Sequence, residues 1–373
     1  MEKGEKIMTE KIKIYVTERI ANILEKDAEG FEFFKKDGRT VNKNALLTNL
    51  VVNYSMNFSE QQNGLLTFFK TKIRGSVCGG EKALNELCFV LCEKLNERSA
   101  APDGEKFDKL VCLKPTRESE PVLDYVEKYC LAGRTLSEYF RSMFASYAAL
   151  PQDLRERIVF KRQYDALLKA INEKKRVFLT TRWGFDRKIE CAPFEIATSK
   201  EELHCYLLAA TKGCNPIRLS RIVSVTQLAA DAEFTQEQRE IFEKMKTYGP
   251  QFVYSPFDKE VLVELTAKGM DKFKKIYVHR PIPVKVENNY YTFCCSRTQI
   301  VQYFVRFGED AKIIYPQRVR DDVYNFHRRA LDRYVRKSGS GAPPEERETG
   351  RRESLSETEF PADRARKEKN PNR

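Results

Sequence analysis

Residues 204–222 read HCYLLAATKGCNPIRLSRI, and this stretch decides the fold of the middle of the chain. An apolar strand breaks at the turn around Gly213, and a second apolar run then carries Arg218 and Arg221. Arginine keeps its charge when partly buried, and its planar fork binds phosphate in bidentate fashion. The two arginines are three residues apart, so a regular strand would point them to opposite faces. They can share a pocket only if the strand bends or ends near Ser220.

The same two arginines also permit a purely structural interpretation. One of them would then pair with a carboxylate such as Glu195 and pin the sheet together. His204, at the start of the stretch, reads as a half-exposed strand residue rather than a ligand.

Three further apolar segments before this stretch, together with the two within it, predict a small all-β domain. Turn residues punctuate the chain at Gly184, Pro193 and Pro216, and a helix is expected around 163–174. Five short strands of this kind fit a small SH3-like β-barrel. We place this domain, with its linker helix, at residues 151–232. The five segments are RVFLTTRW (176–183), DRKIEC (186–191), PFEIA (193–197), LHCYLLAA (203–210) and PIRLSRI (216–222).

Three motifs in this domain resemble those of the WYL family. They are ALLKAI (166–171), the tripeptide Cys205–Leu207 where the family has Trp-Tyr-Leu, and R-L-x-R-I at 218–222. The resemblance implies a regulatory module that binds nucleic acid or a nucleotide-like ligand in a basic pocket. It assigns Arg218 and Arg221 to that pocket. Arg182, Arg187 and Tyr206 lie on strands that would border it.

The residue types favour a single-stranded partner for such a pocket. A tyrosine such as Tyr206, beside arginines, offers a stacking platform for an unpaired base.

The N-terminal part repeats one pattern about 95 residues apart, an offset read from the GRT tripeptides at 38–40 and 133–135. KIKIYVT (11–17) alternates, with apolar residues on one face and Lys11, Lys13 and Tyr15 on the other. LVCLKPT (110–116) begins the second copy. Each copy reads as strand, helix, turn, helix.

Both copies resemble the ribbon-helix-helix family, in which two units pair their strands antiparallel. We therefore expect residues 10–150 to form a tandem ribbon-helix-helix pseudo-dimer, with 59–108 as a helical spacer. In the family the outward face of the ribbon enters the DNA major groove, a role that would fall to Lys11, Lys13 and Tyr15. The second strand offers Leu110, Cys112 and Lys114 outward. The alternative is a retained scaffold that no longer reads sequence.

Residues 233–337 predict a βαββαβ order, which is ferredoxin-like, followed by a long helix. The segment is similar to the C-terminal extension that accompanies many WYL domains, which often mediates dimerisation and can add basic residues to the ligand groove. Arg297, Arg306 and Arg318 are secondary candidates for that role, and a solvated helix face is the alternative for each. Residues 338–373 are rich in Ser, Gly, Pro, Glu and Arg, which predicts a disordered tail.

Composition limits the function classes. The formal net charge is +12, which favours an anionic partner. Three scattered histidines and ten cysteines without a C-x-x-C pair predict no metal site and no cofactor. No nucleotide-binding loop or nucleophile motif occurs, so no enzyme is expected. The absence of an apolar leader or membrane span predicts a cytoplasmic protein.

The sequence therefore predicts an α+β multidomain chain. From residue 10 to about 336, its order of domains resembles that of the WYL accessory proteins encoded beside type VI-D CRISPR effectors. The resemblance implies a single-stranded RNA-binding homodimer that enhances the RNA-guided effector nuclease. The alternative is a transcriptional regulator that grips operator DNA through its head and senses a ligand through the WYL domain. A purely structural dimerisation hub is a third possibility.

Overall fold

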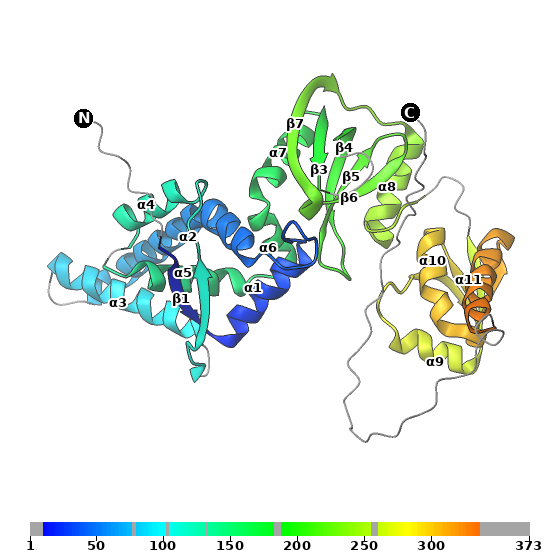
Figure 1. The fold of residues 1–373 in the computed structure, drawn as a ribbon, viewed down its shortest axis with the longest axis horizontal. Coiled ribbons are helices and arrows are strands. Elements are labelled where there is room, and N and C mark those ends of the chain that lie inside the picture. Colours follow the sequence, from blue (N-terminus) through cyan, green and yellow to red (C-terminus); the bar gives the residue numbers. More distant parts are fainter. Residues whose placement is uncertain are drawn as a thin grey trace, which may run out of the picture. The chain divides into compact units, whose positions relative to one another are not determined.

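The computed structural model describes residues 10–76, 80–101, 104–131, 133–182, 188–254 and 260–335. Within them the chain is a mixed α+β fold with three antiparallel sheets. We call residues 10–150 the head, residues 151–232 the central domain and the residues that follow the extension (Figure 1). None of the described helices combines the length and apolarity that crossing a membrane requires.

The head contains the predicted two-stranded ribbon. Strand β1 (Ile12–Val16) pairs antiparallel with β2 (Lys109–Leu113), and Ile14 lies opposite Val111. Ile14 is fully buried, whereas Lys13 and Tyr15 face outward. The two faces predicted from the alternation are therefore confirmed, because burial of every second side chain leaves the intervening ones in solvent.

Each strand of the ribbon is followed by two helices, as the repeat predicted. Thr17 caps the first helix through its side chain, and Thr135 forms a capping box with Glu138. The helices are α1 (Glu18–Gly30) and α2 (Lys43–Ile73) in the first copy, and α4 (Glu120–Tyr129) and α5 (Leu136–Ala148) in the second.

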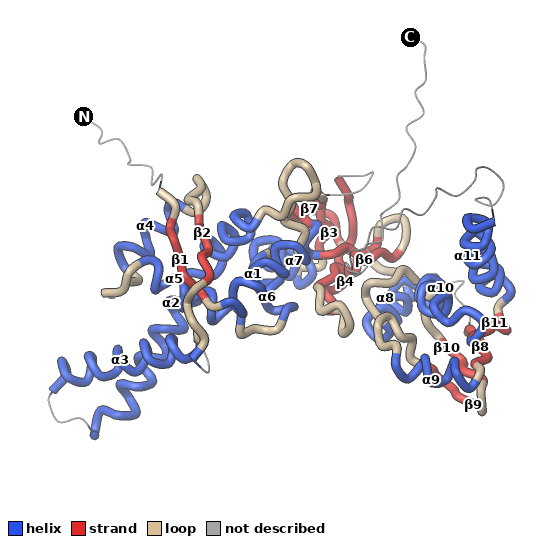
Figure 2. Tube along the Cα trace, turned by 60° about the horizontal axis from the view of Figure 1, so that its bottom comes forward, coloured by secondary structure: helices blue, strands red, loops and turns tan. Residues whose placement is uncertain are grey.

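The spacer is built differently from the prediction. Helix α2 does not end near residue 58 but runs for 31 residues, into the segment expected to be a separate spacer. After a short 3-10 turn (Arg74–Ser76), α3 (Gly80–Ala100) runs back beside it, as Figure 2 shows, and Asn96 donates a hydrogen bond to Gln62 at 2.8 Å. The sequence between 43 and 73 has no proline and only one glycine, so nothing in it stops the helix.

Helices α6 (Gln152–Val159) and α7 (Lys161–Asn172) join the head to the central sheet. A single hydrophobic core continues from the head, through Phe31 and Phe160, into sheet residues such as Leu207. The continuous core fixes the junction between the two domains, where the predicted arginines lie.

The central sheet has the strand order β6-β5-β4-β3-β7. Strand β4 pairs with β3 through 188–191 and with β5 through 192–198, with a register shift at Pro193/Glu195. In the described part of the chain the outer strands β6 and β7 do not pair, so the expected closed SH3-like barrel is an open sheet here. Strand β6 ends at Arg218, and a 3-10 turn (Leu219–Arg221) leads directly into β7. The strands are β3 (Lys175–Thr181), β4 (Lys188–Thr198), β5 (Cys205–Ala210), β6 (Cys214–Arg218) and β7 (Ile222–Asp231).

Helix α8 (Gln236–Tyr248) leads to the extension, whose sheet has the order β11-β8-β10-β9. All neighbouring strands are antiparallel, and this is the order that the predicted ferredoxin-like βαββαβ connection produces. The tail predicted for 338–373 lies outside the described residues. The elements are β8 (Val261–Leu265), α9 (Ala267–Lys275), β9 (Pro283–Glu287), β10 (Tyr290–Phe293), α10 (Arg297–Phe304), β11 (Ala311–Tyr315) and α11 (Gln317–Val335).

Candidate functional site

Arg218 and Arg221 meet at one carboxylate. Strand β6 ends at Arg218, and a 3-10 turn (Leu219–Arg221) follows, so the two side chains do not diverge as they would on a regular strand. Arg218 Nη1 lies 3.4 Å from Glu32 Oε1, and Arg221 donates to the same oxygen through Nη2 at 2.9 Å and Nε at 3.1 Å. The condition set by the sequence, a strand that ends near Ser220, is met.

Arg182 reaches the same residue from the end of β3. Its backbone N–H donates to the Arg221 carbonyl at 2.9 Å, and its Nη1 donates to the Glu32 carbonyl at 3.2 Å. The guanidinium lies over the rings of Phe33 and Phe160, at 4.9 and 5.9 Å from their centroids. Burial lowers the pKa of Arg182, whereas the hydrogen bond to Glu32 raises that of Arg221. We call Arg182, Arg218, Arg221 and Glu32 the arginine site.

Glu32 belongs to the head, in the turn that follows α1. Its backbone φ is 61°, in the left-handed region that residues other than glycine rarely adopt. The turn is held by backbone hydrogen bonds from Phe31 to Asp27, Glu32 to Glu29 and Phe33 to Ala28. The backbone, and not the ion pair alone, therefore places Glu32 against the central sheet.

The sequence did not reveal Glu32 as a partner. The structural alternative named Glu195, but that carboxylate pairs with Lys246 at 2.7 Å instead. Pairing of the arginines with a carboxylate is confirmed, and the identity of that carboxylate was wrong. No local signal links Glu32 to arginines far along the chain.

His204 lies beside Arg218 in a polar cluster that the sequence did not anticipate. It contacts the Arg218 guanidinium, and the Arg218 Nη2 also donates to the Gly30 carbonyl at 2.6 Å. Glu156 is fully buried, accepts from the Cys205 backbone N–H at 2.7 Å and lies 3.4 Å from His204. These contacts fix the Arg218 side chain, which is 15% exposed, while Arg221 is 48% exposed.

Two cavities adjoin the arginine site. One of about 510 Å³ is lined by Glu29, Glu32, Arg218 and Arg221 among others, and one of about 480 Å³ continues past His204 and Arg218 toward Lys26 and Arg155. In the first cavity two guanidinium groups face two carboxylates. Its formal charge therefore balances while Glu32 remains in place.

Tyr206 does not offer the open ring that the sequence analysis expected. It is 9% exposed, and its hydroxyl donates to Glu202 Oε2 at 2.5 Å. Burial, and then Glu202, raise the pKa of Tyr206. His279 of the extension lies 3.4 Å from Glu202; this hydrogen bond holds the pKa of Glu202 at about 2 and raises that of His279. Tyr206 therefore lies buried on β5, opposite Arg218 of β6, and is not a stacking platform in this structure.

The other predicted residues do not join the arginine site. Lys11, Lys13 and Tyr15 are exposed at the ribbon, as predicted. Arg297 is paired with Asp322, and Arg306 donates to the Val278 carbonyl at 3.1 Å. Two predicted candidates remain: Arg318 is exposed on α11, and Arg187 lies outside the described residues.

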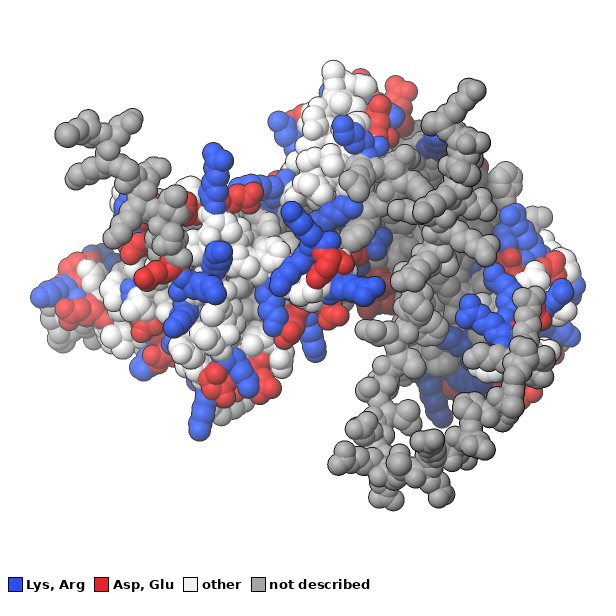
Figure 3. Space-filling view, viewed as in Figure 1, with Lys and Arg blue, Asp and Glu red and all other residues white. Residues whose placement is uncertain are grey.

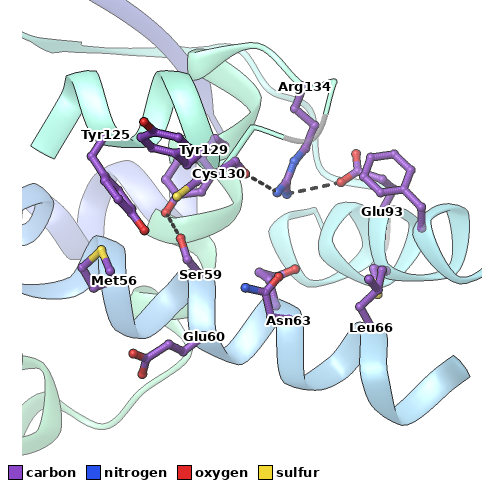
Figure 4. A pocket seen from close by; sticks show the side chains of 14 residues that line it. Met56, Ser59, Glu60, Asn63, Leu66, Glu93, Tyr125, Tyr129, Cys130 and Arg134 are labelled. Atoms are coloured by element: carbon purple, nitrogen blue, oxygen red, sulfur yellow. Dashed lines mark hydrogen bonds and ion pairs between the residues drawn. The ribbon is translucent and has the colours of Figure 1, made fainter. Parts of the chain in front are cut away.

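A third cavity, of about 360 Å³, lies inside the head between α2, α3 and α4 (Figure 4). Arg134 lies 3.3 Å from Glu93 there, and burial raises the pKa of Glu93. Glu60 also lines it, so two carboxylates accompany one guanidinium. This charge balance suits a polyanion less well than the arginine site does.

The net positive charge is not gathered in one place. On the face shown in Figure 3, basic and acidic side chains are interspersed over the described residues. Among those residues, no group of three or more His, Cys, Asp or Glu side chains could hold a metal ion. The local convergence of the arginines, rather than a broad basic surface, is what singles out the site.

Comparison with known proteins supports the fold. No family model and no curated protein matches the chain. The chain is similar to a solved structure described as a CRISPR Cas-related protein, with a TM-score of 0.59 and 18% identity, over 90% of this chain and 97% of that one. Proteasome accessory factor B/C of Arthrobacter aurescens also aligns, over 62% of this chain and 38% of that chain with 16% identity, but its TM-score of 0.22 is too low to carry an argument.

Proposed function

We propose that this protein is a CRISPR accessory protein that binds single-stranded RNA at the arginine site and enhances an RNA-guided RNase. The sequence resemblance to WYL accessory proteins supports this, as does the likeness in fold to a CRISPR Cas-related protein over nearly the full length of both chains. The observation that carries the proposal is the convergence of the Arg218 and Arg221 guanidinium groups on the Glu32 carboxylate, while Arg182 donates to the backbone carbonyl of the same residue.

The chemistry of the site suits a phosphate. Arg221 meets a carboxylate through two nitrogens, the fork geometry with which arginine also binds phosphate oxygens. A phosphate in the position of the Glu32 carboxylate would contact Arg218 and Arg221 together. The proposal assigns no catalytic step to this chain.

The position of the site favours a single strand over a duplex. Arg218 is 15% exposed and lies where the head meets the central sheet, beside Arg221, which is 48% exposed. A flexible single strand can bring one phosphate to both side chains at this junction, whereas the phosphates of a duplex are held on a rigid rod.

The partner in this proposal is a type VI-D effector nuclease. Binding of RNA by a homodimer would present two arginine sites and raise the local RNA concentration near that nuclease.

A second function, transcriptional regulation through the head, is favoured by one observation. Lys13 and Tyr15 are exposed on β1, where the ribbon-helix-helix resemblance places base contacts. The other strand of the ribbon presents Leu110 and Cys112, which offer little to base edges.

The test compares affinities for single-stranded RNA, single-stranded DNA and duplex DNA of equal length. We expect R218A/R221A to weaken single-stranded RNA binding by at least about tenfold, because each lost charge-assisted hydrogen bond is worth about 1.5–3 kcal/mol. The matched control K11A/K13A removes the same charge from the ribbon and should leave RNA binding unchanged. Preference for duplex DNA, lost in K11A/K13A and kept in R218A/R221A, would instead support the regulator.

A further inference from the structure

The Glu32 carboxylate occupies the position in which the proposed function places a phosphate. It accepts hydrogen bonds from both arginines of the central domain, and one oxygen, Oε1, is shared between them. A phosphodiester has two non-bridging oxygens and one negative charge, so it can make the same contacts. Two anions cannot fill this position together.

We propose that Glu32 is a gate: its carboxylate stands in for an RNA phosphate, and the side chain must swing out before RNA can fill the arginine site. This inference rests on the proposed function and adds a regulation of the same site by the head.

The backbone of the turn allows a movement of the side chain alone. Glu32 is anchored through its N–H to the Glu29 carbonyl and through its own carbonyl to Arg182. Phe31 and Phe33 on either side are buried in the common core. These contacts do not involve the carboxylate, so the junction of head and central domain persists when the carboxylate leaves.

The surroundings give the displaced carboxylate a place to go. The cavity of about 510 Å³ that contains Glu32 also extends along Glu29, Phe34 and Gly38 of the head. Once Glu32 has rotated toward solvent, Arg218 and Arg221 face Glu29 alone, and the cavity becomes net positive. The charge that attracts RNA therefore becomes available only when the gate opens.

The left-handed backbone of Glu32 adds to this interpretation. A residue other than glycine is strained at a φ of 61°, and such strain persists where the surrounding structure fixes the backbone in that conformation. Asparagine or glycine would relieve the strain in an ordinary turn.

The test uses the full-length protein and measures affinity for single-stranded RNA. Glu32→Gln keeps the size of the side chain and removes the competing charge, so we expect binding to tighten about tenfold, the effect of one close charge pair. The matched control is Glu127→Gln, which removes one negative charge from an exposed position on α4, away from the two cavities that adjoin the arginine site. Glu127 makes no ion pair within the described part of the chain, and we expect this control to change affinity by less than about twofold.

Two further variants keep the outcome decisive. Glu32→Asp retains the charge but shortens the reach to both arginines, and it should tighten binding by a smaller factor than Glu32→Gln. Should Glu32→Gln fail to fold, as thermal denaturation would show, Glu32→Asp against the wild type decides the question. The gate is overturned if the Glu32 variant that folds binds single-stranded RNA no more tightly than the matched control does.

The two proposals fail in different ways. Unchanged affinity in Glu32→Gln, together with lost binding in R218A/R221A, removes the gate and leaves the RNA site. If the triple variant that combines R218A/R221A with Glu32→Gln binds single-stranded RNA as tightly as Glu32→Gln alone, the arginine site does not bind RNA, and the proposed function fails as well.

Discussion

At the scale of single residues, the ion pair between Arg155 and Asp27 shows how this fold accommodates buried charges. Arg155 forms a two-pronged ion pair with Asp27, through Nε at 2.7 Å and Nη2 at 2.9 Å, and Tyr147 donates to the same carboxylate at 2.6 Å. Asp27 is 3% exposed and the Arg155 side chain 13%. The trio ties α1, α5 and α6 together directly beside the arginine site.

Removing one member of this trio should be costly. We predict that Arg155→Met lowers the free energy of unfolding by about 3–5 kcal/mol, because Asp27 would remain as a buried, unpaired charge. The double variant Asp27→Asn/Arg155→Met removes both charges and should be milder than the single one. Chemical denaturation measures both. A single variant that is as stable as the double one would contradict this account of the trio.

The arginines show what residue chemistry reveals and what it does not. The spacing of Arg218 and Arg221 set a condition for a shared pocket, a strand that bends or ends near Ser220, and β6 meets it by ending at Arg218. Their partner could not be predicted, because Glu32 lies 186 residues before Arg218 and no local pattern joins the two. Burial of the Tyr206 ring could not be predicted either, because the residues around a tyrosine in an apolar strand do not show whether its ring is covered or exposed.

At the scale of elements, periodicity predicted the types of structure well and their ends less well. The alternation of 11–17 predicted the inward and outward faces of β1, and the repeat predicted its pairing with β2. The length of α2 was missed because its apolar pattern continues past the point where the repeat ended. Closure of the barrel was overpredicted, because pairing between the first and last strands is a long-range property that strand patterns do not contain.

Two glycines in helices provide a test at this scale. A Cβ at Gly269 of α9 would lie 2.1 Å from the Asp310 carbonyl oxygen, and Asp310 is held by Thr266 and by Lys272. Gly269→Ala should therefore destabilise the extension by about 1–3 kcal/mol. Gly64 in α2 has open space around it, so Gly64→Ala should stabilise the protein by about 0.5–1 kcal/mol. Thermal denaturation compares them, and equal effects of the same sign would refute the close packing at Gly269.

At the scale of the whole molecule, the candidate site arises where two domains meet. The sequence motifs resemble those of a ribbon-helix-helix unit and of a WYL domain, and they lie in separate parts of the chain. The site requires both, since the head supplies Glu32 and the central domain supplies the three arginines. A sequence read domain by domain therefore predicts the cationic half of the site and misses the anionic half.

The central claim is that Arg218 and Arg221 bind phosphates of single-stranded RNA, and the salt dependence of binding tests it most directly. The logarithm of the association constant falls linearly with the logarithm of salt concentration, with a slope of about −0.7 for each phosphate contacted on a single strand. Because Arg218 and Arg221 together hold one phosphate in this account, R218A/R221A should have a slope shallower by about 0.7 than the wild type. Identical slopes for the two proteins would show that these arginines do not contact the RNA backbone, and would contradict the account.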